Sequence, residues 1–199
     1  MSKSQTIKIF LMNTLVLTFL FGQDISYPPP TTLVTMPTAG TLVKGSFALE
    51  MRVQKGGGMS TALQVGITDR FQFGSSFGAS NLIGDDSLRW YPRPEVNLKY
   101  RLIDETTSMP GVSLGINTQG FGGYNGADSL KRYDTKAYGV YAAASKNWQT
   151  PIGNTGLHMG MSYNFLEVAD GDEDPNIFFG MDFEFNPELS VLLEWNAAL

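Results

Sequence analysis

A two-residue alternation of apolar and polar side chains restricts the fold of this chain more than any other feature. Between residues 43 and 53, apolar side chains or glycine at the odd positions alternate with Lys44, Ser46, Ala48, Glu50 and Arg52. Successive side chains of a β-strand point to opposite faces, so this pattern predicts a strand. Its return in segment after segment predicts an all-β chain.

Nine segments carry the alternation, and glycine and proline residues separate them. We expect strands at residues 41–54, 59–68, 71–80, 95–104, 112–121, 135–147, 156–165, 176–185 and 189–196. One face of each strand is apolar, as at Met159 and Met161, and the other is polar, as at His158 and Ser162. A soluble β-sandwich shows the same alternation with its apolar side buried, so the pattern alone does not distinguish a sandwich from a membrane barrel.

The first 40 residues do not fit the sheet pattern. Lys3 and Lys8 precede an apolar run at residues 9–21, which is the layout of a signal peptide, and we expect residues 1–22 to be removed. The run is too short for a membrane-spanning helix, which needs about 20 residues. Residues 23–40 are rich in proline, which lacks the amide donor of a sheet ladder. They predict a leader before a single β-domain at residues 41–199.

Charge and cysteine content narrow the class of protein. Without Lys3 and Lys8, the 14 basic side chains become 12 against 19 acidic ones, a net charge of −7, which argues against nucleic acid as a partner. The chain has no cysteine, so disulfides cannot stabilise it after export. A closed wall with complete hydrogen bonding would supply that stability.

Loop length separates the barrel from the sandwich. Successive connections of an up-and-down sheet lie at alternate ends. At one end they are long, at residues 55–58, 81–94, 122–134 and 166–175. At the other end they are tight or modest, at residues 69–70, 105–111, 148–155 and 187–188. Bacterial outer-membrane barrels combine short periplasmic turns with longer external loops. The asymmetry favours an antiparallel, up-and-down transmembrane β-barrel of about 8–10 strands.

One hairpin carries a family resemblance. Its sequence is Val65-Gly66-Ile67-Thr68-Asp69-Arg70-Phe71-Gln72-Phe73-Gly74. It resembles the Gly-Leu-Thr-Asp-Arg-x-x-x-Gly hairpin that recurs in bacterial outer-membrane β-barrel proteins. The central Asp-Arg pair suits a two-residue turn. The resemblance covers this hairpin alone, and it implies a porin-like barrel in the outer membrane without implying a chemistry.

The number of expected strands is odd, whereas single-chain bacterial barrels normally have an even number. Three explanations stay open: a strand is miscounted, further strands follow Leu199, or the barrel closes on assembly. We favour the second, a barrel that is incomplete at the C-terminal end of this sequence.

The polar face of the strands is expected to line the barrel interior. Its charged side chains are Lys44, Glu50, Arg52, Glu95, Lys99, Arg101, Asp182, Glu184 and Glu194. Side chains just fill the interior of a barrel of eight to ten strands, so we expect these charges to pair in a packed core. Passage of small solutes is the alternative for a wider barrel.

Candidates for catalysis are few. His158, the only histidine, shares a face with Ser162 and Asn164. This set is similar to the serine, histidine and asparagine of outer-membrane phospholipases, although the spacing differs. Serine hydrolysis needs the nucleophile and its base in hydrogen-bond contact, which the spacing does not establish. We interpret the three side chains as polar lining.

An acidic loop is the one candidate metal site. Asp170, Asp172 and Asp174 occupy every second position, a pattern able to present oxygen ligands to calcium. The loop departs from the helix-loop-helix calcium template, because Pro175 and Met181 stand where that template has glycine and glutamate. We expect a solvated external loop, and a calcium-binding loop is the alternative.

These observations predict a non-enzymatic protein of the bacterial cell outer membrane that needs no cofactor. Its expected partners are outer-membrane lipid and small solutes or extracellular ligands. Its expected role is envelope structure, surface binding or porin-like passage. A secreted or periplasmic β-sandwich that binds a ligand or carbohydrate through its long loops is the alternative, and an enzyme acting on lipid ranks third.

Overall fold

The computed structural model describes residues 29–84, 86–186 and 188–197. Within these ranges, the regular elements are strands and one short 3-10 turn, η1 (Lys55–Gly57). The strands are β1 (Phe47–Gln54), β2 (Gly58–Thr68), β3 (Phe71–Ser80), β4 (Arg89–Trp90), β5 (Glu95–Ile103), β6 (Gly111–Asn117), β7 (Phe121–Asn125), β8 (Arg132–Thr135), β9 (Gly139–Thr150), β10 (Gly153–Tyr163), β11 (Asn176–Asn186) and β12 (Leu189–Asn196). The predicted all-β class is confirmed.

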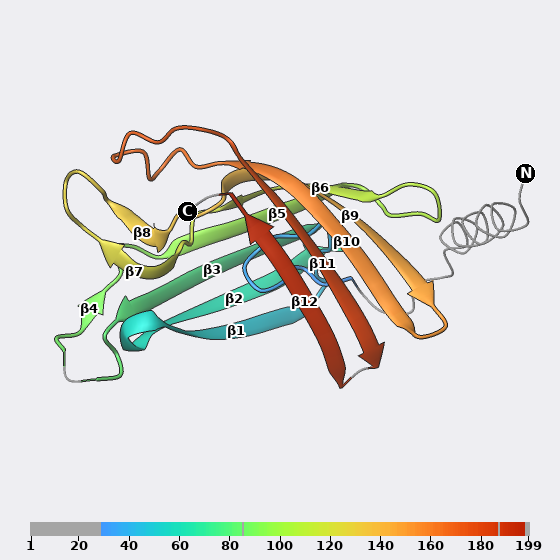
Figure 1. Ribbon diagram of the computed structural model, residues 1–199, viewed down its shortest axis with the longest axis horizontal. Coiled ribbons are helices and arrows are strands. Elements are labelled where there is room, and N and C mark those ends of the chain that lie inside the picture. Colours follow the sequence, from blue (N-terminus) through green and yellow to red (C-terminus); the bar gives the residue numbers. More distant parts are fainter. Residues whose placement is uncertain (1–28, 85, 187, 198–199) are drawn as a thin grey trace, which may run out of the picture.

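Nine of these strands form one continuous antiparallel meander. Their order is β1-β2-β3-β5-β6-β9-β10-β11-β12, with β1 and β12 at the two edges. The short β4 pairs with β3, and β7 and β8 form a separate hairpin. The sheet curls strongly, so β1 to β3 and β10 to β12 run in clearly different directions (Figure 1). This half-barrel is compatible with a β-barrel architecture, and the twist inherent to strands produces its curvature.

The nine predicted strands are all present, and their boundaries differ for local reasons. β3 and β12 match the expected ranges. β1 begins at Phe47 instead of residue 41, because the chain turns at Gly45, whose φ of 78° is incompatible with a strand. β9 extends to Thr150 and β10 begins at Gly153, so the expected link at residues 148–155 is a two-residue turn. Pro151 lacks an amide donor and ends the ladder there.

The two faces of the sheet have opposite polarity, and the polar face is the buried one. On the concave inner face, Glu95, Lys99 and His158 are each 1% exposed. On the convex outer face, Leu49 and Met51 remain 63% exposed. A water-soluble domain normally buries its apolar side chains and exposes its charged ones. The described chain therefore has the reverse distribution.

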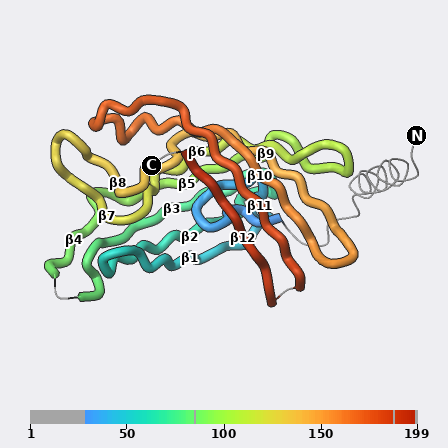
Figure 2. The backbone as a smooth tube through the Cα atoms, in the orientation of Figure 1, coloured from blue at the N-terminus to red at the C-terminus, as the bar shows by residue number. Residues whose placement is uncertain are grey.

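Residues 29–42, which we call the inner segment, lie against the concave face. The sequence predicted a leader for most of this stretch, and proline content indicated only that it stays out of the ladder. Figure 2 shows the segment, in blue, looped within the curl of the sheet. Met36 and Thr38 are fully buried there. The inner segment thus fills space that the strands enclose.

The connections at the two ends of the sheet differ in length, as the sequence predicted. The β2–β3, β5–β6, β9–β10 and β11–β12 links are short and share one end, the short-loop end. The opposite, long-loop end carries three long connections, namely the loop with β4, the β7–β8 hairpin and the loop between β10 and β11. It also carries the three-residue η1, which is shorter than the β5–β6 link of seven residues and departs from the predicted difference. The sequence did not predict β4, β7 and β8. Among the described residues, no helix has the length and apolar character needed to cross a membrane.

Candidate functional site

The inner segment has a compact turn of its own. The Leu33 amide donates to the Met36 carbonyl over 2.9 Å. Gly40 lies against the carbonyl oxygens of Pro30 and Pro29, which a Cβ would approach to 2.5 Å and 2.7 Å. Only glycine fits at this close approach of two backbones. The segment therefore holds a defined shape against the wall.

Lys99 on β5 binds the inner segment through its ammonium group. Its Nζ donates to the Thr31 carbonyl over 2.5 Å and to the Gly40 carbonyl over 3.0 Å. Among the residues the structure describes, no carboxylate forms an ion pair with it. A buried cation needs strong acceptors to offset its lost hydration. The two carbonyls of the inner segment provide them.

A hydrogen-bond relay joins three strands to the inner segment. Asp182 Oδ1 on β11 lies 2.6 Å from His158 Nε2 on β10, and His158 Nδ1 lies 2.7 Å from Ser145 Oγ on β9. Ser145 Oγ also accepts the Ala39 amide over 2.8 Å. With Nε2 protonated, each bond has one donor and one acceptor, and the relay is fully satisfied.

The order aspartate, histidine, serine also occurs in hydrolytic triads, but access differs here. Ser145 is buried, and the inner segment occupies one side of its hydroxyl. His158, Ser162 and Asn164, which the sequence predicts as polar lining, are all buried, and the Asn164 amide donates to the carbonyl of Ala137 and the carboxylate of Glu167. The arrangement around His158 therefore anchors the inner segment through Ser145.

The far side of the inner segment is held by β11 and β12. Glu194 accepts the Thr35 and Met36 amides over 2.9 Å and 3.1 Å, and the Thr35 hydroxyl over 2.5 Å. Leu33 and Met36 pack over Gly180, where a Cβ would come within 2.6 Å and 2.8 Å of their terminal carbons. The glycine makes room for these two side chains, which join a buried apolar cluster with Tyr138, Tyr141, Ala143 and Phe178.

Two further contacts extend the binding across the sheet. The Ser113 hydroxyl on β6 donates to the Thr38 carbonyl over 3.2 Å. The Leu42 amide donates to the Gln72 side-chain carbonyl on β3 over 3.0 Å. The inner segment is therefore in contact with β3, β5, β6, β9, β11 and β12, which together span most of the curl.

Loops cover the interior at the long-loop end. The Tyr133 hydroxyl of β8 donates to Glu95 over 3.2 Å, and its ring meets the Tyr91 ring edge to face at 5.1 Å. The Tyr91 hydroxyl donates to Gln54 over 3.1 Å. Burial, with Glu95 adding to it, raises the pKa of Tyr133 well above its usual range. Burial also raises the pKa of Tyr91. Both hydroxyls therefore stay protonated and can donate.

Glu167 organises the neighbouring loop segments. Its carboxylate accepts the Tyr133 and Ala137 amides, each over 2.7 Å, and also the Asn164 side-chain amide. Glu167 is buried. A buried carboxylate with several donors is a strong fixed point, because removing it leaves those donors unpaired. The carboxylate ties the loop after β10 to the β8–β9 connection.

The other charged residues expected in the interior lie in three places. Glu50 pairs with Arg52 on β1, and the Arg52 guanidinium sits 4.7 Å from the Phe121 ring centre. Arg101 donates to the Asp69 carbonyl over 2.7 Å at the short-loop end.

The third place is the inner face of the β10–β11 pair, where the Glu184 carboxylate accepts the Asn154 side-chain amide over 3.2 Å. Lys44 lies outside this set. It occupies the turn before β1, and its side chain is exposed.

The acidic loop predicted as a calcium alternative is occupied by cationic side chains. Asp170 pairs with Arg132 over 2.6 Å and with Lys136 over 2.9 Å, and Asp172 pairs with Lys136 over 3.0 Å. Burial opposes ionisation of Asp170, but these donors outweigh it and hold the pKa of its carboxyl well below the usual range. Asp174 is exposed, and its amide donates to Asp172. In the described ranges, no group of three or more potential ligands is arranged to hold a metal ion.

Sequence reasoning missed two parts of the site. Ser145 lies on the polar face of its strand by alternation. The alternation could therefore have assigned it to the inner face, but not to a position beside His158. The inner segment has no periodicity that would indicate where it packs. Comparisons with protein-family models, curated proteins and solved structures gave no match.

Proposed function

We propose that this chain forms the wall of a β-barrel in a bacterial outer membrane and acts without catalysis, in envelope structure or surface binding. One observation carries the proposal, namely the apolar outer face. Phe47, Val53 and Met161 are 73%, 69% and 58% exposed, while polar side chains of the inner face, among them Lys99, His158 and Ser162, are buried. Lipid tails are the solvent in which such a face is stable, because they demand neither hydrogen bonds nor charge.

The distribution of loops gives the wall an orientation. The short-loop end would face the periplasm and the long-loop end the outside, as in bacterial barrels generally. Surface binding would then fall to the long loops, which Glu167 and the tyrosine contacts hold in place. A closed wall also requires a partner strand at the free edges of β1 and β12, since unpaired backbone is not tolerated in lipid.

The filled interior favours a structural role over passage of solutes. The inner segment and the side chains that bind it occupy the space between the curled strands. A porin-like passage would require the inner segment to leave, with loss of the Lys99, Ser145 and Glu194 contacts. The Ala39 amide of the inner segment donates to Ser145 beside His158, which supports a binding role for this cluster over catalysis on lipid. In the described ranges, no second sheet covers the outer face, and nothing there favours the β-sandwich alternative.

Two measurements test the proposal. Detergent-extracted protein should migrate differently on a gel before and after boiling, because a closed barrel keeps its fold in detergent until heated. Protein that partitions into the aqueous fraction and migrates identically in both lanes would refute the membrane wall. In planar bilayers we expect no steady open level, whereas a reproducible conductance would favour passage.

A further inference from the structure

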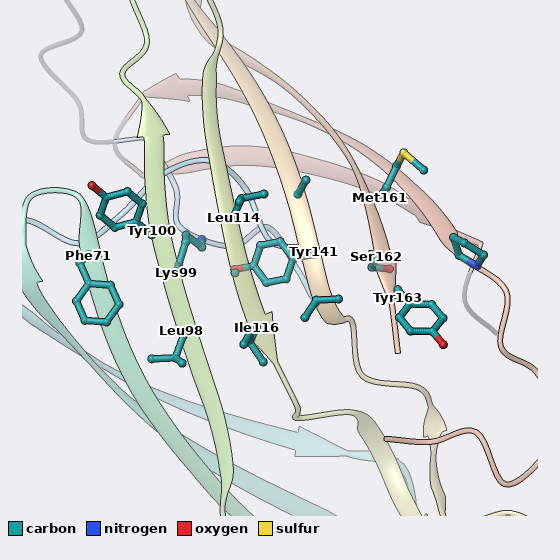
Figure 3. A pocket seen from close by; sticks show the side chains of 14 residues that line it. Phe71, Leu98, Lys99, Tyr100, Leu114, Ile116, Tyr141, Met161, Ser162 and Tyr163 are labelled. Carbon is teal, nitrogen blue, oxygen red and sulfur yellow. The ribbon is translucent and has the colours of Figure 1, made fainter. Parts of the chain in front are cut away.

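The outer face of the wall is not evenly convex. A hollow of about 550 Å³ lies across β3, β5, β6, β9 and β10 on that face. Figure 3 shows the outward side chains around it, among them Leu98, Leu114, Ile116 and Met161. A small side chain, Ala142, stands between the larger Leu114 and Met161 in the register of the sheet. The step in side-chain size explains the depression.

Two rows of partnered residues border the hollow. The first row pairs five strands in register, Phe71, Tyr100, Leu114, Ala142 and Met161. The second row pairs Leu98, Ile116, Val140 and Tyr163. Both rows are apolar apart from two tyrosine hydroxyls. The hollow is thus elongated across the strands, and its long axis follows the register.

The long axis of the hollow runs from the short-loop end of β3 to the long-loop end of β10. Phe71 is the first residue of β3 at the short-loop end, whereas Met161 and Tyr163 are near or at the end of β10 at the long-loop end. Strands about 4.8 Å apart place the two ends of the row about 19 Å from each other. With strands tilted about 45° to the membrane normal, the row climbs about 14 Å, close to half of a hydrocarbon core about 30 Å thick.

The chemistry of the hollow restricts its occupant. The backbone groups of β6, β9 and β10 there are engaged in sheet pairing on both sides. An extended peptide segment lying in the hollow would bring amides and carbonyls that find no partners, which is costly. A saturated hydrocarbon chain brings none. It would touch the wall on several sides instead of one, and so gain dispersion contacts over a chain on a convex surface.

We infer that this hollow binds one acyl chain of a membrane lipid in preference to the rest of the outer face. The inference rests on the proposed membrane location. It adds to the proposed function a specific site for a lipid tail, formed by the two rows that border the hollow.

The test uses the full chain reconstituted in phosphatidylethanolamine vesicles doped with the same lipid carrying a photoreactive group midway along one tail. After illumination, mass spectrometry of peptides reports where the tail was attached. We expect labelling at Leu114, Val140 and Met161 to be several-fold higher than at Leu49 and Met51, which are outward-facing residues on β1.

Two matched variants sharpen the test. Ala142→Trp fills the hollow and should reduce labelling of its border several-fold. Ala144→Trp, on the same strand and parity but outside the hollow, should leave the labelling in place. Both positions point outward, and the heat-dependent gel shift verifies that each variant is folded.

The outcomes separate the two claims. Labelling spread evenly over the outer face, or unchanged in Ala142→Trp, would overturn the acyl-chain site while keeping the membrane wall. Absence of tail labelling on the outer face, with protein that stays in the aqueous fraction, would overturn both. Cross-links from the hollow to a second polypeptide in place of lipid would also overturn the acyl-chain site.

Discussion

The inner and outer faces of the same strands differ in polarity and also in the type of contact that their side chains make. Inner side chains make directed contacts, such as Lys99 to two carbonyls and Glu194 to two amides. Outer side chains such as Leu49 and Met51 are simply exposed and apolar. The inner face therefore specifies one arrangement of the inner segment, while the outer face specifies a surrounding medium. Substitutions should accordingly fail for different reasons on the two sides.

The largest expected effect is a charge on the outer face. Leu114→Arg places a guanidinium in the middle of β6, and in a bilayer it should cost about 2–4 kcal/mol of folding free energy. Urea unfolding of vesicle-reconstituted protein, followed by tryptophan fluorescence, measures the change. Glu173→Arg, in an exposed loop, is the control and should change stability little. Equal stability of Leu114→Arg and the parent protein would show that this face does not contact lipid.

The second effect tests the inner face. Lys99→Met keeps the length of the side chain but removes its hydrogen bonds to the Thr31 and Gly40 carbonyls, of which the Thr31 carbonyl still accepts the Thr38 amide over 3.3 Å. A hydrogen bond from a charged group contributes about 1.5–3 kcal/mol, and we expect a loss of that order in the same unfolding measurement. Lys131→Met, an exposed loop lysine, serves as the control. A neutral result for Lys99→Met would mean that the ammonium does not hold the inner segment.

A third substitution examines packing between the inner segment and the wall. Gly180→Ala adds a methyl group that meets the ends of Leu33 and Met36. These side chains are flexible, so we expect a loss of about 1 kcal/mol, at the low end of the range for overpacking. Gly126→Ala, where a Cβ meets nothing within 4 Å, is the matched control. Faster proteolysis of the inner segment in Gly180→Ala would locate the effect, and equal behaviour of the two variants would argue against this contact.

The smallest effect concerns the loops beyond the two faces. The folded-state pKa of Asp170 is depressed, so its contribution is present above the unfolded pKa of about 3.9 and is lost as the pH falls through the folded value. Limited proteolysis of the loop at residues 166–175 should therefore accelerate only below about pH 4. Asp170→Asn should make cleavage fast at neutral pH as well. A loop equally protected in Asp170→Asn would assign its order to other contacts.

The sequence predicted the strands of the sheet much better than the inner segment and the contacts inside the sheet. Alternation identified all nine strands of the meander, because each segment shows the alternation independently of the others. The contacts of His158 depend on register: Ser145 lies directly across the β9–β10 pair, and Asp182 lies diagonally on β11. Register between strands cannot be read from spacing along the chain. The inner segment escaped prediction because proline excludes a ladder without indicating a packing partner.

The two edge strands of the sheet share a direction. Every neighbouring pair from β1 to β12 is antiparallel, and with nine strands in the series β1 and β12 point the same way. A seam that joined them directly would be the one parallel joint in the wall, with slanted instead of perpendicular hydrogen bonds. A seam that keeps every joint antiparallel needs an odd number of inserted strands. In a closed barrel, the number of strands inserted between β1 and β12 would therefore decide whether every strand pair is antiparallel.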